Sequence, residues 1–186
     1  MTIATFRIFL LASFFLPLSA LAAPPETAAH RLKAEISPAD GGLSVTDQVS
    51  FKSPRSEFVF TLHRGLSPAA EGAAIEELPP GTAAERYGIN SSSAQGLYAA
   101  YRLTTRTPAR GFTLKYGGVL NHPPGEQAQE YSRSFSETPG TISPEGCYLS
   151  GASGWYPHFE NSLVTFRLET VLPAPYDSVA GGARVA

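Results

Sequence analysis

The chain has 186 residues, a formal net charge of −2 at neutral pH, 42% hydrophobic residues and one cysteine. This length suits one domain with its own hydrophobic core. Lys and Arg are scattered singly, which excludes the basic stripe of a nucleic-acid-binding protein. A lone cysteine excludes an internal disulfide framework, so we expect Cys147 to be a small buried apolar residue.

The first 22 residues are typical of a secretory signal peptide. Arg7 precedes an apolar run over 8–18, and Ala20-Leu21-Ala22 supplies the small residues that a signal peptidase requires. Because the run is shorter than the roughly 20 residues that cross a bilayer, we expect cleavage after Ala22 and an exported, periplasmic or extracellular product with no membrane segment. Residues 23–28, rich in Pro and Ala, are expected to form a flexible leader before a single domain over 29–186.

Alternating apolar and polar residues predict a β-hairpin at the start of this domain. Strands are expected over 30–36 and 43–51, joined by the turn formers of 37–42, and a third strand follows at 58–62. Asp47 falls on the apolar register, which predicts either a β-bulge there or a cap at a sheet edge. His30 lies on an apolar register too, and we expect a packed, hydrogen-bonded ring rather than a metal ligand.

The middle of the chain predicts more loops than strands. Residues 69–93 contain Pro and Ser clusters, with a short strand expected at 75–78 and a one-turn helix at 83–87 as an alternative to loop. A second hairpin is expected from strands 97–103 and 112–116 around a turn at 107–111. A long polar loop follows over 121–145.

The last regular pattern is a half-buried strand over 163–172, with Val164, Phe166, Leu168 and Thr170 on one face. Short strands at intervals of about ten residues, turns rich in Pro and Gly, and little helix predict an all-β fold, an antiparallel β-sandwich or open barrel with long loops.

The candidate binding surface lies just before that strand, where the only Trp stands among other aromatic residues. Rings of this kind bind a peptide or a sugar, and core packing is the alternative interpretation. The residues proposed for this surface are Tyr148, Ser150, Trp155, Tyr156, His158 and Glu160.

Catalytic and metal-binding motifs are missing from the sequence. It has no H-E-x-x-H and no C-x-x-C, so no catalytic residue, metal site or cofactor is predicted for this chain. His158 and Glu160 would project to one side of an extended segment, as an acid/base or metal pair or as a solvated strand entry. Ser153 lacks the second glycine of a nucleophile elbow, because Trp155 stands in its place.

Several of these segments, in their order, resemble the amino-terminal domain of the aminopeptidase N family of zinc (gluzincin) metallopeptidases. The resemblance covers about residues 30–182. It is carried by His30-x-Leu32-x-Ala34-x-Ile36-x-Pro38, Leu43-x-Val45-x-Asp47-x-Val49, Phe60-x-Leu62-His63-Arg64-Gly65-Leu66, Leu114-x-Tyr116-Gly117-Gly118-x-Leu120, Trp155-Tyr156-Pro157 and Val179-Ala180-Gly181.

The resemblance implies a saddle-like β domain that packs on a thermolysin-like zinc domain and shapes the cleft in which an amino-terminal residue is removed. Zinc is then expected only in that companion domain, and the chain, inactive by itself, is expected to be truncated at its C-terminal end. Its partners would be the catalytic domain or a peptide substrate. The alternative is a free-standing secreted β-sandwich that binds a peptide, glycan or protein. Truncation would leave an exposed edge at 164–172 or 178–180.

Overall fold

The computed structural model of the chain describes residues 25–87, 96–122 and 140–185. Most of these residues lie in β-strands, accompanied by the short α-helix α1 (Pro80–Tyr87), so the prediction of an all-β fold is confirmed. The predicted signal peptide lies outside the described residues and stays a prediction. Within the described ranges, no helix is long and apolar enough to cross a membrane.

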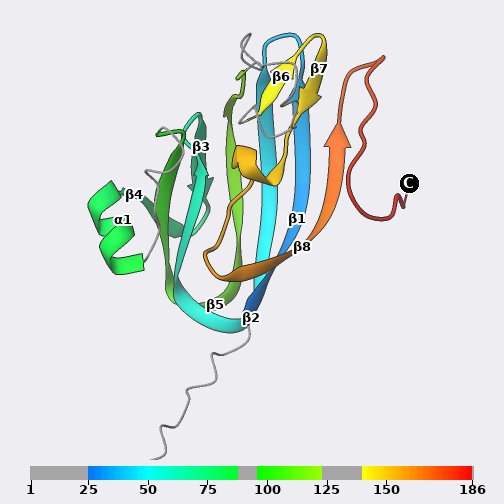
Figure 1. The fold of residues 1–186 in the computed structure, drawn as a ribbon. Coiled ribbons are helices and arrows are strands. Elements are labelled where there is room, and N and C mark those ends of the chain that lie inside the picture. Colours follow the sequence, from blue (N-terminus) through cyan, green and yellow to red (C-terminus); the bar gives the residue numbers. More distant parts are fainter. Residues whose placement is uncertain (1–24, 88–95, 123–139, 186) are drawn as a thin grey trace, which may run out of the picture.

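A large sheet with the order β3-β5-β2-β1-β8 forms the body of the domain, and β4 pairs with β5 beside this path (Figure 1). The strands of this sheet are β1 (Glu26–Ser37), β2 (Gly42–His63), β3 (Leu66–Ala70), β4 (Ala73–Leu78), β5 (Tyr98–Val119) and β8 (Ser162–Val171). The predicted first hairpin is confirmed, because β1 and β2 pair antiparallel around the turn at 38–41. The predicted leader over 23–28 is too long: β1 already begins at Glu26, where Glu26 pairs with Ser162 and Ala28 is fully buried.

The two long strands β2 and β5 bend at the same level of the sheet. The β2–β5 register shifts between Ser50 and Glu57, where Arg55 pairs with Ala109. Each bend contains a proline, Pro54 or Pro108, which has no amide hydrogen to donate to a neighbouring strand.

The predicted second hairpin, from strands 97–103 and 112–116, is therefore wrong. These two segments are consecutive halves of β5, and each pairs with a different half of β2. The proline that indicated a turn marks a bend within one strand.

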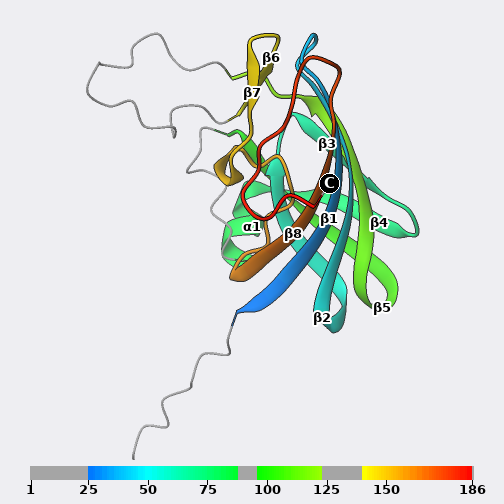
Figure 2. The same cartoon turned by 90° about the vertical axis from the view of Figure 1, so that its right-hand side faces the viewer.

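The sheet is mixed rather than purely antiparallel. β8 pairs with β1 in parallel, from Glu26 opposite Ser162 to Glu35 opposite Val171. A parallel neighbour requires a crossover, and the chain makes it across one face of the sheet through β6 (Thr141–Ser143), β7 (Gly146–Tyr148) and the 3-10 helix η2 (Gly151–Ser153). In Figure 2, β6 and β7 lie on one side of the curved sheet.

The hydrophobic core lies between the large sheet and this crossover. Alternate residues of β1, β2 and β5 are buried on one face, and the crossover covers them with Ile142, Leu149, Trp155, Tyr156 and Phe159. The layer opposite the sheet is thus a short hairpin and irregular chain rather than a second extended sheet. On the other face, Ala83 of α1 packs with Leu78 and Ala100 in a small separate cluster.

Gly118 allows β3 to approach β5 closely. A Cβ atom at this position would lie 1.8 Å from the carbonyl oxygen of Gly65. We expect Gly118→Ala to lower the free energy of unfolding by about 1–3 kcal/mol through this overpacking, as measured by urea denaturation followed by circular dichroism. Gly181→Ala is the control, because its added Cβ meets no atom within 4 Å. Equal stability of the two variants would contradict the observed β3–β5 packing.

Candidate functional site

The aromatic loop, residues 148–160, is held in place by backbone hydrogen bonds to β2. β1 pairs only with the first half of β2, so the second half has backbone groups available on that edge. His158 uses both its N–H and its carbonyl to pair with Thr61, each at 2.9 Å, and the Gly154 carbonyl accepts from the His63 N–H at 2.8 Å. The loop therefore has a fixed position on the sheet.

Gly154 makes the turn that directs the loop into the core. Its φ is +63°, a left-handed conformation that glycine adopts without penalty. An added Cβ would also lie 2.5 Å from a ring carbon of Tyr98, whose hydroxyl donates to the Ala152 carbonyl. After this turn the chain inserts Trp155, which is 8% exposed, and then Phe159, which is 4% exposed.

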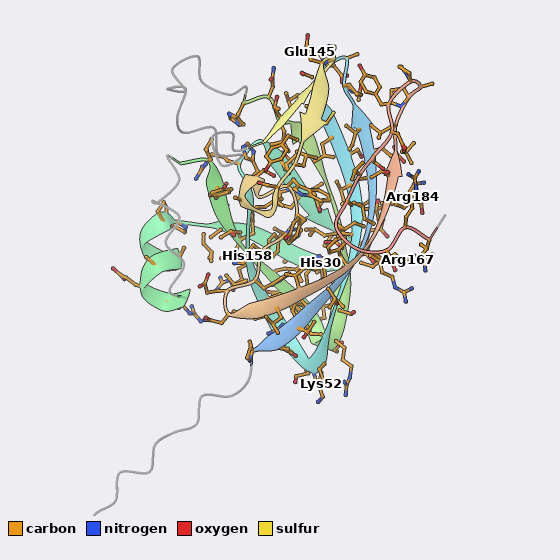
Figure 3. All side chains as sticks on the ribbon, turned by 45° about the vertical axis from the view of Figure 1, so that its right-hand side comes forward. His30, Lys52, Glu145, His158, Arg167 and Arg184 are labelled. Carbon is orange, nitrogen blue, oxygen red and sulfur yellow. The ribbon has the colours of Figure 1, made fainter. Side chains whose placement is uncertain are left out.

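Of the six residues predicted for the binding surface, two line a cavity and four do not. Trp155 and Tyr156 pack edge to face, with ring centroids 5.2 Å apart, and both line a cavity. Tyr148 and Ser150 are partly exposed outside the cavity lining, while His158 and Glu160 are exposed (Figure 3 labels His158).

Ser153 serves local structure. Its buried side chain donates a hydrogen bond of 2.6 Å to the Ser150 carbonyl at η2. A hydroxyl in this position faces its own turn, which agrees with the missing elbow motif.

The cavity has a volume of about 450 Å³ and lies between the core face of β1 and β8 on one side and the aromatic loop on the other. Residues 176–181 of the C-terminal segment form a further wall. This segment is attached by the Tyr176 hydroxyl, which donates to the Pro144 carbonyl at 2.7 Å, and by a 2.6 Å contact between the hydroxyls of Thr170 and Ser178.

Cys147 also lines this cavity and is exposed. The prediction of a buried cysteine is therefore wrong. Its strand, β7, pairs only with the three-residue strand β6 at the periphery of the fold and is not covered on both faces.

A buried polar pair lies beneath the aromatic loop. Nδ1 of His30 is 2.7 Å from Oδ2 of Asp47, and both side chains are fully buried (Figure 3 labels His30). The packed, hydrogen-bonded ring predicted for His30 is confirmed. Asp47 occupies neither a bulge nor an edge, because it pairs in regular register with Leu32 and Leu114 in the middle of the sheet.

The buried environment of Asp47 and Tyr116 disfavours their charged forms. Burial raises the pKa of the Asp47 carboxyl above its ordinary value, and the His30 hydrogen bond opposes that shift. Burial, and then the proximity of Asp47, raises the pKa of Tyr116 well above its ordinary value. Within the described part of the chain, Nε2 of His30, Oδ1 of Asp47 and the Tyr116 hydroxyl have no hydrogen-bond partner.

A second histidine contact joins the end of β2 to the chain after β5. Nε2 of His63 lies 3.0 Å from Nε2 of His122, and Nδ1 of His63 accepts the Gly65 N–H at 2.9 Å. Because Nδ1 of neutral His63 is the acceptor, its proton must be on Nε2, which then donates to His122. No local pattern predicts this pairing, since the two residues are 59 positions apart.

These residues do not fit a zinc ion. A zinc site in a protein uses at least three protein ligands, and the contact between His63 and His122 supplies two. Across the described ranges, no group of three or more His, Cys, Asp or Glu side chains is placed to hold a metal ion.

Asp47→Ala is expected to lower the free energy of unfolding by about 1–3 kcal/mol, because it leaves Nδ1 of His30 buried without its hydrogen-bond partner. Asp47→Asn should cost less, since an amide oxygen can still accept from Nδ1 of His30. Urea denaturation of both variants measures the difference. Equal losses would show that the hydrogen bond to His30 does not contribute.

Acid is expected to destabilise the domain through His63. Burial, and then the charge of His122, lowers the pKa of His63 below its ordinary value of 6.5. The unfolded chain therefore binds the proton more tightly, and stability is lost as pH falls below about 6.5 towards the lowered folded value. His63→Gln should lose less stability than the parent between about pH 8 and pH 5, whereas His158→Gln, at an exposed position, should follow the parent. A steeper loss in His63→Gln would contradict this assignment.

No family model and no curated protein sequence matches the chain. Among solved structures, the M1 zinc metallopeptidase from Deinococcus radiodurans is similar with a TM-score of 0.34 and 16% identity, covering 81% of this chain and 32% of that one. A variant of that enzyme bound to a Tyr-Ser-Ala substrate is similar with a TM-score of 0.34 and 16% identity, covering 79% of this chain and 32% of that one. A two-domain M1 zinc metallopeptidase variant bound to L-tryptophan is similar with a TM-score of 0.33 and 15% identity, covering 79% of this chain and 32% of that one. The chain thus spans about one third of the length of these structures.

Proposed function

We propose that the chain is an exported, non-catalytic β domain that binds an apolar segment of a protein partner in the cavity beside the aromatic loop. The cavity is the observation that carries this proposal. We propose further that the partner is the catalytic domain of an aminopeptidase N-like zinc metallopeptidase, whose cleft this domain shapes. The sequence motifs described above support that choice of partner, and the zinc would be held by the partner.

The cavity has the size and lining of a binding site. Binding sites for small ligands typically measure roughly 300–1,000 Å³ and are lined mainly by hydrophobic and aromatic side chains. Here Leu32 from β1, Val164 and Leu168 from β8, and the rings of Trp155 and Tyr156 face the cavity of about 450 Å³. An apolar side chain placed there would contact a wall built from three separate parts of the chain.

Phe166 adds a driving force for binding. It lines the same cavity, yet it is 52% exposed. Covering apolar surface stabilises a complex by roughly 25 cal/mol per Å², so a partner that covers this ring gains affinity. A large aromatic side chain in such a position is typical of the few residues that contribute most of the binding energy.

The alternative function is that of a free-standing secreted module for a peptide, glycan or other protein. One observation favours it: residues 176–181 already complete a wall of the cavity, so this chain builds the site by itself. The two functions differ in the ligand that they predict, an apolar surface of a zinc domain or a free ligand in solution.

Trp155 provides the measurement, because it is the only Trp and lines the cavity. We expect its fluorescence to change on titration with an isolated thermolysin-like zinc domain of an aminopeptidase N family member. Tyr156→Ala should weaken that binding about tenfold or more, through loss of a ring at the site. Tyr148→Ala is the matched control, because this tyrosine lies outside the cavity lining.

The ligand that changes the fluorescence separates the two functions. A response to short apolar peptides or glycans, and not to the zinc domain, would favour the free-standing module. Equal binding by Tyr156→Ala and Tyr148→Ala would refute the cavity as the site.

A further inference from the structure

β8 is the last strand of the large sheet, and its outer edge has no strand beside it in the described part of the chain. It pairs with β1 only. The C-terminal segment runs beside the outer side of β8 (Figure 1), where the Ser178 and Thr170 hydroxyls are in contact at 2.6 Å. Within the described residues, none of its backbone hydrogen bonds joins β8, and that of Tyr176 goes to the Pro173 carbonyl, so the backbone groups on the outer edge of β8 are not used by this segment. Such an edge presents free N–H and carbonyl groups that can pair with another strand.

The charge of Arg167 is not balanced by the neighbouring strand β1, whereas Glu169 lies opposite Lys33. Arg167 lies opposite Arg31 of β1, which places two like charges side by side. No ion pair of Arg167 is found within the described residues, although Arg31, Lys33 and Glu169 surround it in the register. An acidic residue on the open side of β8 would compensate Arg167.

β8 itself carries that acidic residue on the same face. Leu163, Thr165, Arg167, Glu169 and Val171 are all exposed on this face. If two copies of β8 pair antiparallel with Leu168 opposite Leu168, each Arg167 lies opposite Glu169 of the other copy. A pairing centred on Arg167 would oppose two arginines, and one centred on Glu169 would oppose two glutamates. The charges therefore select the register centred on Leu168.

We propose that a second copy of this chain pairs with the outer edge of β8, antiparallel and centred on Leu168, to form a two-fold symmetric dimer. A two-fold axis is the natural result, because the same strand serves both copies. The opposite face of the two paired β8 strands is also compatible with this register, because it brings Leu168 opposite Leu168 and Phe166 opposite Thr170 without opposing like charges. This dimer goes beyond the function proposed for the cavity and does not depend on it.

The pairing involves one short strand from each copy, so the dimer should be reversible and concentration-dependent. Sedimentation of the purified full chain over about 10 µM to 1 mM measures its dissociation constant. Arg167→Glu replaces both attractive pairs by pairs of glutamates and should weaken the dimer about tenfold. Glu169→Arg should do the same by opposing arginines.

The double variant Arg167→Glu with Glu169→Arg provides the decisive measurement. It restores opposite charges across the pair, and its dissociation constant should return to within about threefold of the parent. Lys52→Glu, at the exposed bend of β2 (Figure 3), is the control for a charge change elsewhere and should leave the dimer unchanged. Thermal melts followed by circular dichroism show that each variant is folded.

Three results would overturn the proposal. One is a monomer at every concentration, and another is a dimer that neither single variant weakens. The third is a double variant that remains as weak as the single variants, because the register centred on Leu168 requires the rescue. Failure of the cavity to bind a partner would affect none of these measurements, so the two proposals are tested separately.

Discussion

The paired backbone hydrogen bonds between Thr61 and His158 fix where the aromatic loop crosses the large sheet, and the core depends on that crossing. The sheet is apolar on one face, and the described residues form no second extended sheet that covers it. The ring centroid of Phe159 lies 5.0 Å from that of Phe51 and 5.8 Å from that of Phe60. The loop thus provides the kind of apolar ring that a second sheet would otherwise contribute. The loop is therefore part of the core as well as one wall of the cavity. A site built in this way is preorganised, because moving the wall would expose the core.

The buried His30–Asp47 pair constrains the part of the sheet that the aromatic loop covers. His30 also contacts Tyr156 edge to face, with centroids 5.7 Å apart, so the polar pair lies directly under a ring that lines the cavity. A one-residue slip between β1 and β2 would turn every side chain of one strand to the opposite face. In the observed register both polar groups face the core and share one hydrogen bond. The pair thus favours one register at the cost of desolvating a carboxyl group.

Local patterns predict the first hairpin correctly, whereas features that depend on distant residues are missed. The alternation over 30–36 and 43–51 and the turn between them are local, and the first hairpin was predicted correctly. Pro108 also indicates a turn locally, but the chain continues through it as β5, because the residues on both sides of Pro108 pair with β2 across the sheet. Asp47 looked misplaced because its partner His30 is 17 residues away. Trp155 and Tyr156 were recognised from composition, yet the cavity requires β8 to lie parallel to β1, which no spacing in the sequence indicates.

β8 joins the cavity to the open sheet edge. Within the described residues it has a neighbouring strand on one side only, and none of its own residues is buried. Its alternate side chains point to different surfaces: Val164 and Leu168 face the cavity, while Arg167 and Glu169 lie on the exposed face. Weakly supported elements of this kind are where binding surfaces are commonly found, because they can gain order from a partner without rearranging the core. A ligand in the cavity and a strand at the edge would therefore both contact β8, through alternate residues of the same strand.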